Sequence, residues 1–133
     1  MKIRSYGLAS GDLISTWEPD NEHWEVMGEE SRLSDASVVA ALDCSNLWVH
    51  FAGKDDLGLG EQACGRGWLT GTHAVHFFKD APRGQTFRLI TREIEFKGRK
   101  GRSIAALFDT QGTLYAVAED ILIQVNWAPM SEV

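Results

Sequence analysis

The stretch that decides the fold is ASVVAALDCSNLWVHF, residues 36–51, which runs for about four helical turns without glycine or proline. Just before it, residues 31–35 offer several side chains that are able to cap the N-terminus of a helix. We therefore predict a helix over residues 35–51. Its apolar side chains are spread around most of the helix circumference, so the pattern predicts burial on most sides.

Residues 66–125 carry the pattern of a β-sheet. Segments rich in β-branched and aromatic residues alternate with turn sequences that contain Gly, Pro or Asp, and the predicted strands are 68–79, 86–98, 102–109 and 113–125. Their short connections predict that consecutive strands are antiparallel neighbours, because a parallel pair needs a crossover of about a dozen residues or more. Residues 13–17 form one further predicted strand in an otherwise irregular N-terminal region.

One apolar helix beside one antiparallel sheet predicts an α+β fold in a single domain, residues 1–133. A twisted antiparallel sheet has one face to cover, and this helix is the element available to cover it. We therefore expect an antiparallel sheet of five or six strands wrapped around one long central helix.

The bulk properties exclude several classes of partner. A net charge of −6 makes binding to a nucleic-acid backbone unfavourable. The sequence has no apolar run long enough to span a bilayer, so we expect no membrane partner and a cytoplasmic protein. Cys44 and Cys64 lack close spacing, which favours reduced thiols over a metal site. His73 and His76 are three residues apart on a predicted strand, so they face opposite sides and cannot chelate one metal ion together.

Three segments in this order carry a resemblance to a known family. AALDCSNLWVHF (40–51) has an Asp in mid-helix, HAVHFFKDAPRGQTF (73–87) has a strand, a Pro-x-Gly turn and a strand, and EFKGRKGRSIAALFDTQGTLYAVAEDILIQV (95–125) has a Gly-Arg-Ser step and an Asp-x-x-Gly turn. Together they resemble the hotdog-fold acyl-CoA thioesterases of the phenylacetate-degradation and 4-hydroxybenzoyl-CoA type. The resemblance extends over about residues 31–125.

This resemblance implies a hydrolase that cleaves an acyl-CoA thioester, with Asp43 as the catalytic base or nucleophile. It implies a homodimer or a dimer of dimers (a homotetramer), with sites that form across two subunits. No cofactor is implied other than the coenzyme A of the substrate, and no metal. Many such enzymes have His-Gly-Gly at the start of the helix, whereas this chain has Ser-Asp-Ala-Ser at 34–37.

The resemblance also implies three groups of residues around Asp43. Backbone amides at the helix start would hold the thioester carbonyl as an oxyanion, and those residues are Asp35, Ala36 and Ser37. Polar residues that follow Asp43 would position the substrate, and these are Ser45 and Asn46. Exposed basic side chains would bind the nucleotide end of coenzyme A, and these are Arg83, Lys97, Arg99 and Arg102.

Other interpretations of the same residues remain open at this point. Asp43 can be a structural carboxylate that hydrogen-bonds locally, and Asp35 can be the N-cap that occupies the amides an oxyanion would need. The chain can equally be a non-catalytic module that binds acyl-CoA or an apolar ligand. A hotdog hydratase or dehydratase, which would pair a His with an acidic residue, and a cone-shaped NTF2-like domain are the remaining alternatives.

Overall fold

The computed structural model describes residues 2–19, 24–27, 30–50, 66–82 and 84–126. The strands are β1 Lys2–Gly7, β2 Leu13–Glu18, β3 Trp24–Met27, β4 Glu30–Leu33, β5 Arg66–Phe77, β6 Phe87–Lys97, β7 Lys100–Asp109 and β8 Leu114–Asn126, and the helix is α1 Asp35–Trp48. Six strands form one sheet in the order β1-β2-β6-β7-β8-β5, while β3 and β4 pair as a separate hairpin. All neighbouring strands are antiparallel.

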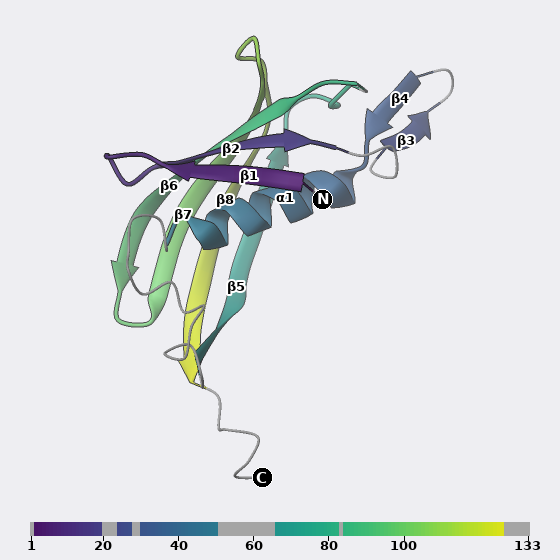
Figure 1. Ribbon diagram of the computed structural model, residues 1–133. Coiled ribbons are helices and arrows are strands. Elements are labelled where there is room, and N and C mark those ends of the chain that lie inside the picture. The colour runs from purple at the N-terminus through teal and green to yellow at the C-terminus, as the bar shows by residue number, and fades with distance from the viewer. Residues whose placement is uncertain (1, 20–23, 28–29, 51–65, 83, 127–133) are drawn as a thin grey trace.

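The sheet curls around α1, which lies across its concave face (Figure 1). The helix packs mainly on β8, β7 and β6. Large aromatic side chains fill one part of the core, where the Phe87 and Tyr115 rings meet edge-to-face with centroids 5.7 Å apart. Small buried residues such as Ala105 and Ala118 line the strands beneath the helix. The predicted α+β arrangement of one helix in a curled antiparallel sheet is therefore confirmed.

The helix differs from the prediction at its C-terminal end and in its burial. It ends at Trp48 rather than at residue 51, and the amide of His50 bonds to the Leu47 carbonyl in a tightened last turn. One face is buried, at positions spaced as the inward stripe of a helix, and these are Val38, Ala41, Leu42, Ser45 and Asn46. The other face is partly open in the single chain, where Trp48 is 42% exposed and Val39 and Leu47 are partly exposed.

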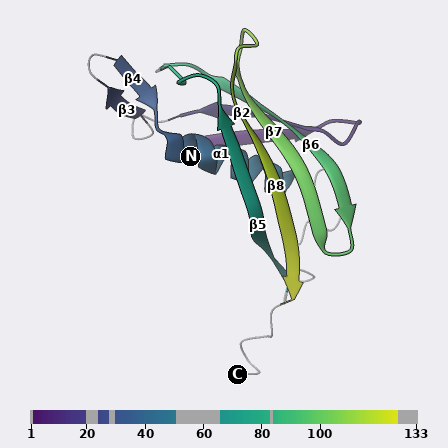
Figure 2. The ribbon, with the colours of Figure 1, turned by 180° about the vertical axis from the view of Figure 1, so that it is seen from behind.

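The order of the strands confirms the predicted neighbours β6–β7 and β7–β8 and corrects the predicted pairing of β5 with β6. β5 lies at the edge of the sheet beside β8, not beside β6 (Figure 2). Residues 81 and 82, in the connection between β5 and β6, contact β4 and not the six-stranded sheet. The Leu33 amide donates to the Ala81 carbonyl at 2.9 Å, and the backbones of Arg32 and Pro82 form an isolated antiparallel bridge. β6 therefore joins the sheet on the far side of β7, next to β2. β1 and the β3–β4 hairpin were not predicted.

The C-terminal end of α1 is followed by a buried histidine that rests on a glycine of β7. The His50 side chain is fully buried, and its Nδ1 lies 2.7 Å from a carboxylate oxygen of Glu93. A Cβ atom added to Gly101 would stand 2.7 Å from His50 Nε2 and 2.8 Å from Cε1. The strand can approach this ring closely because residue 101 has no side chain.

We expect Gly101→Ala to lower the free energy of unfolding by about 1–3 kcal/mol, because a buried ring has to move to accommodate the methyl group. Urea denaturation of the variant measures this loss. A double-mutant cycle with His50→Ala supplies the control, since the methyl group should cost much less once the ring is gone. Additive effects of the two substitutions would contradict the clash.

Within the described residues, no helix combines the length and the apolar character that crossing a lipid bilayer requires.

Candidate functional site

Asp43 lies on the flank of α1, at the border between its buried and open faces. Its neighbour Leu42 is completely buried, whereas 45% of the Asp43 side chain is exposed. A rotation of about 100° per residue carries position 43 out of the inward stripe, so the carboxylate stands beside the sheet instead of beneath the helix. Asp43 is thus open to solvent on one side and faces protein on the other.

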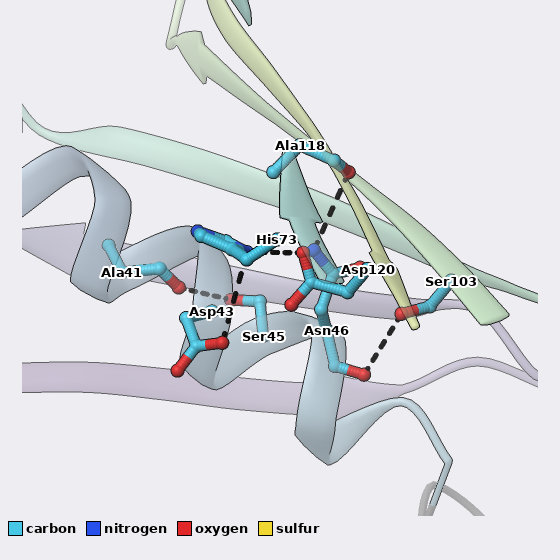
Figure 3. Close-up of polar contacts among 8 residues, drawn as sticks. All are labelled: Ala41, Asp43, Ser45, Asn46, His73, Ser103, Ala118 and Asp120. Atoms are coloured by element: carbon cyan, nitrogen blue, oxygen red, sulfur yellow. Dashed lines mark hydrogen bonds and ion pairs between the residues drawn. The ribbon is translucent and has the colours of Figure 1, made fainter. Parts of the chain in front are cut away.

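The protein groups that Asp43 faces are His73 and Asp120, which lie directly opposite each other on β5 and β8. His73 Nδ1 contacts a carboxylate oxygen of Asp120 and lies 3.8 Å from the nearer carboxylate oxygen of Asp43 (Figure 3). Exposure falls along the row from Asp43 at 45% through His73 at 15% to Asp120 at 0%. The three side chains lead from solvent into the core, and we call them the Asp43–His73–Asp120 cluster.

The buried end of the cluster is electrostatically strained. Burial raises the pKa of Asp120 to about 6, and the neighbouring carboxylate of Asp43 also raises it, while the contact with His73 opposes both effects. Among the described residues, Asp120 Oδ2 and His73 Nε2 are buried without a hydrogen-bond partner. Two carboxylates therefore share one imidazole in a site that leaves polar atoms unsatisfied.

The start of α1 is arranged differently from the interpretation that Asp35 is the N-cap. The N-cap is Ser34, whose hydroxyl accepts the Ser37 amide at 3.1 Å. Asp35 is the first helical residue, and its exposed carboxylate pairs with Arg32 at 2.8 Å. Of the three amides expected to hold an oxyanion, that of Ser37 is thus occupied by the cap, while those of Asp35 and Ala36 point out of the first turn without an intrahelical acceptor.

These amides are far from Asp43 in the same chain. Asp35 and Asp43 are eight positions apart, which corresponds to about 12 Å along a helix. One thioester carbonyl cannot contact both at once. The single chain therefore brings Asp43 together with His73 and Asp120, but not with the helix start.

Ser45 and Asn46 lie on the buried face of the helix. The Ser45 hydroxyl donates to the Ala41 carbonyl at 3.1 Å. The Asn46 side-chain amide points to the Ala118 carbonyl at 3.5 Å, and its backbone carbonyl accepts the Ser103 hydroxyl at 3.1 Å (Figure 3). Both residues attach the helix to itself or to the sheet, and their role in positioning a substrate stays a prediction.

The basic residues expected to bind coenzyme A gather at the β6–β7 hairpin. Lys97 and Arg99 are exposed at its turn. Arg102 is exposed on the convex face of the sheet, where it lines a pocket of about 210 Å³ together with Glu119. That face is opposite to the one that carries Asp43. Arg83 lies outside the described residues.

Sequence reasoning missed Asp120 and the inward orientation of His73. The alternation Ala116, Ala118, Asp120, Leu122 on β8 contains the signal for Asp120, since it places this carboxylate in a row of buried apolar residues. The opposite orientations expected for His73 and His76 are confirmed, because His73 faces the helix and His76 is exposed.

Comparisons with known proteins support the fold. No protein-family model matches the chain, and no curated protein matches its sequence. Solved structures do match. The E. coli PaaI protein of the phenylacetic acid degradation operon superposes with a TM-score of 0.72 at 10% identity, covering 96% of this chain and 83% of that one. A Streptococcus mutans protein bound to acetyl-CoA has a TM-score of 0.75 at 12% identity, covering 96% and 91%. The Haemophilus influenzae thioesterase HI1161 has a TM-score of 0.73 at 12% identity, covering 96% and 81%. The chain therefore shares the fold of these structures, which is the hotdog fold.

Proposed function

We propose that this chain hydrolyses an acyl-CoA thioester, with Asp43 as general base or nucleophile. The observation that carries the proposal is the position of the Asp43 carboxylate, which is half exposed on the central helix and backed by two further titratable side chains. Hotdog structures of thioesterases and of an acetyl-CoA complex support the substrate class at the level of the fold.

In the base mechanism, Asp43 accepts a proton from water while the water oxygen attacks the thioester carbonyl carbon. The carbonyl oxygen takes up negative charge, for which backbone amides at a helix start are suitable donors. The C–S bond then breaks, and the departing thiolate recovers the proton. Cys44 is a poor alternative nucleophile, because burial and the charge of Asp43 raise the pKa of its thiol.

The amides for this reaction come from a second copy of the chain in our proposal. A distance of about 12 Å along α1 separates Asp43 from the Asp35 amide of its own helix. The outer edge of β5 has no partner strand among the described residues, and an open edge of this kind can pair with another chain. A dimer, or a dimer of dimers, would bring the helix start of one subunit towards Asp43 of the other.

Subunit complementation tests both parts of this proposal. Asp43→Asn removes the carboxylate, and Asp35→Pro removes one helix-start amide. The helix should tolerate this proline, because the residue before it, Ser34, already has the extended backbone, with ψ of 146°, that proline requires of its predecessor. We expect each variant alone to release little thiol from a panel of acyl-CoAs. Refolded together in equal amounts, they should recover about a quarter of wild-type activity. Half of the dimers are then mixed, and each mixed dimer contains one intact site of two. A mixture no more active than the separate variants would contradict a shared site.

Lys97 and Arg99 at the hairpin turn are our proposed contacts for the phosphates of coenzyme A. Replacing both by Gln is expected to raise KM and to leave kcat nearly unchanged, because the contacts would be the same in the ground state and the transition state. The increase in KM should be larger at low ionic strength than at high, since exposed charges are screened by salt. An unchanged KM would remove these residues from the site.

The contact of a histidine with the Asp43 site favours hydration or dehydration of an acyl-CoA as the second candidate function. An imidazole and a carboxylate can serve as the acid and the base of such a reaction. Product analysis separates the candidates, because hydrolysis releases free thiol whereas hydration leaves the thioester intact. Acyl-CoA binding without either product would indicate a binding module.

A further inference from the structure

We propose that Asp43, His73 and Asp120 form a binding site for one divalent transition-metal ion of the Zn²⁺ type. The three side chains come from α1, β5 and β8, and each offers one ligand atom. These atoms all lie within 4.8 Å of one another. Residues from three separate elements thus converge on one point, although they are distant in sequence.

The carboxylates of Asp43 and Asp120 would be stabilised by a bound cation. Within the described part of the chain, the two carboxylates have ion pairs with His73 alone and with no Lys or Arg side chain. Burying a carboxylate without full compensation costs several kcal/mol, even after the surroundings relax. Asp120 is the buried member, with 0% of its side chain exposed and Oδ2 without a hydrogen-bond partner in the described residues. Figure 3 shows His73 joined by dashed lines to the Asp120 carboxylate and to the Asp43 carboxylate.

The donor set indicates which ion would bind. Imidazole suits Zn²⁺ and its transition-metal neighbours, whereas Mg²⁺ and Ca²⁺ favour sets made of oxygen alone. Three protein ligands with one open position are typical of zinc sites that also hold water or a substrate atom. The half-exposed Asp43 side supplies that opening. The buried Asp120 and His73, of whose side chain 15% is exposed, form the closed side.

The spacing requires only a small adjustment. Two ligands about 2.1 Å from one ion stand at most about 4.2 Å apart. His73 Nδ1 and Asp43 Oδ1 are 3.8 Å apart, which already satisfies this limit. A hydrogen bond joins His73 Nδ1 to Asp120 Oδ1. A bound ion would displace the proton of this hydrogen bond and move the nitrogen and the oxygen apart. Asp43 can close the remaining gap by a side-chain rotation, because it is not held in the core.

Direct titration of the chelator-treated full chain with Zn²⁺, Co²⁺ and Mg²⁺ tests the site. Cys44→Ser and Cys64→Ser form the background, so that thiols do not capture the ion. We expect one Zn²⁺ or Co²⁺ per chain by calorimetry, a Co²⁺ absorption band in the visible range, and much weaker binding of Mg²⁺. His73→Gln should weaken Zn²⁺ binding at least about a hundredfold, since it removes a ligand.

The matched control is His76→Gln, the same change on the outward side of the same strand, which should leave the affinity for Zn²⁺ unaltered. If His73→Gln does not fold, Asp43→Asn takes its place, because that side chain is half exposed. Equal Zn²⁺ affinity in the ligand variant and in His76→Gln would overturn the site, and so would Mg²⁺ binding as tight as that of Zn²⁺ or the absence of saturable binding.

The metal site shares Asp43 with the proposed hydrolase but does not depend on it, and the two can fail separately. Thiol release that persists in chelator, together with no Zn²⁺ binding, would reject the metal site and keep the hydrolase. Zn²⁺ binding that is lost in His73→Gln, without thiol release from any acyl-CoA, would keep the metal site and reject the hydrolase.

Discussion

Replacing Asp43 by Asn is expected to reduce the rate of thiol release from acyl-CoA at least about a hundredfold, which is the usual loss when a general base is removed. Asn has nearly the shape of Asp but neither accepts the water proton nor acts as a nucleophile. The side chain is half exposed, and its one ion-pair contact in the described structure is His73 at 3.8 Å. The variant should therefore fold and bind substrate.

Steady-state kinetics check this expectation, with kcat falling and KM nearly unchanged. Glu119→Gln is the matched control, because it also neutralises one acidic residue, on the exposed face of β8 beside Asp120. Circular dichroism should show the same fold in both variants. Turnover by Asp43→Asn equal to that of the control would exclude Asp43 from the chemistry.

Replacing Asp120 by Asn is expected to stabilise the metal-free protein above pH 7 by about 1–3 kcal/mol, because the variant no longer buries a charge. The pKa of Asp120 is raised from 3.8 to about 6 in the folded chain. A raised carboxyl pKa favours folding below the unfolded value, and this contribution is lost as the pH rises through the folded value. The wild-type protein should thus lose stability relative to the variant between about pH 4 and pH 7.

Urea denaturation in the presence of chelator, at intervals from pH 4 to pH 8, measures this difference. The stability advantage of Asp120→Asn should grow with pH and become constant above about pH 7. Asp35→Asn, an exposed carboxylate on the same domain, should show no comparable trend. A difference in stability between wild type and Asp120→Asn that does not change with pH would mean that Asp120 has the same pKa in the folded and in the unfolded chain.

Much of the fold follows from local patterns in the sequence. The helix over residues 35–51 was predicted within three residues, because its apolar spacing and its preceding cap residues are local signals. The strands between residues 66 and 126 follow from alternation and turn residues in the same way. β1 was missed because its alternation, KIRSYG, contains few apolar residues.

The site was less accessible to prediction, because it depends on pairing between distant strands. Asp43 is recognisable on its helix, but its neighbours become evident only when β5 is placed beside β8. Short connections favoured β6 as the partner of β5, and the contact of Ala81 with Leu33 is what takes that connection away from the sheet. The inward position of Asp120 was readable from alternation, whereas its pairing with His73 was not.

The edge position of β5 also has a consequence for biosynthesis. β5 has one partner in the described sheet, and that partner, β8, is the last of the described strands to be made. Until residues 114–126 leave the ribosome, β5 has no strand to pair with, and an unpaired strand of this kind is prone to aggregation. The Asp43–His73–Asp120 cluster is therefore completed only after β8 has been made. A chain that stops before β8 loses both the buried carboxylate and the strand that holds the histidine.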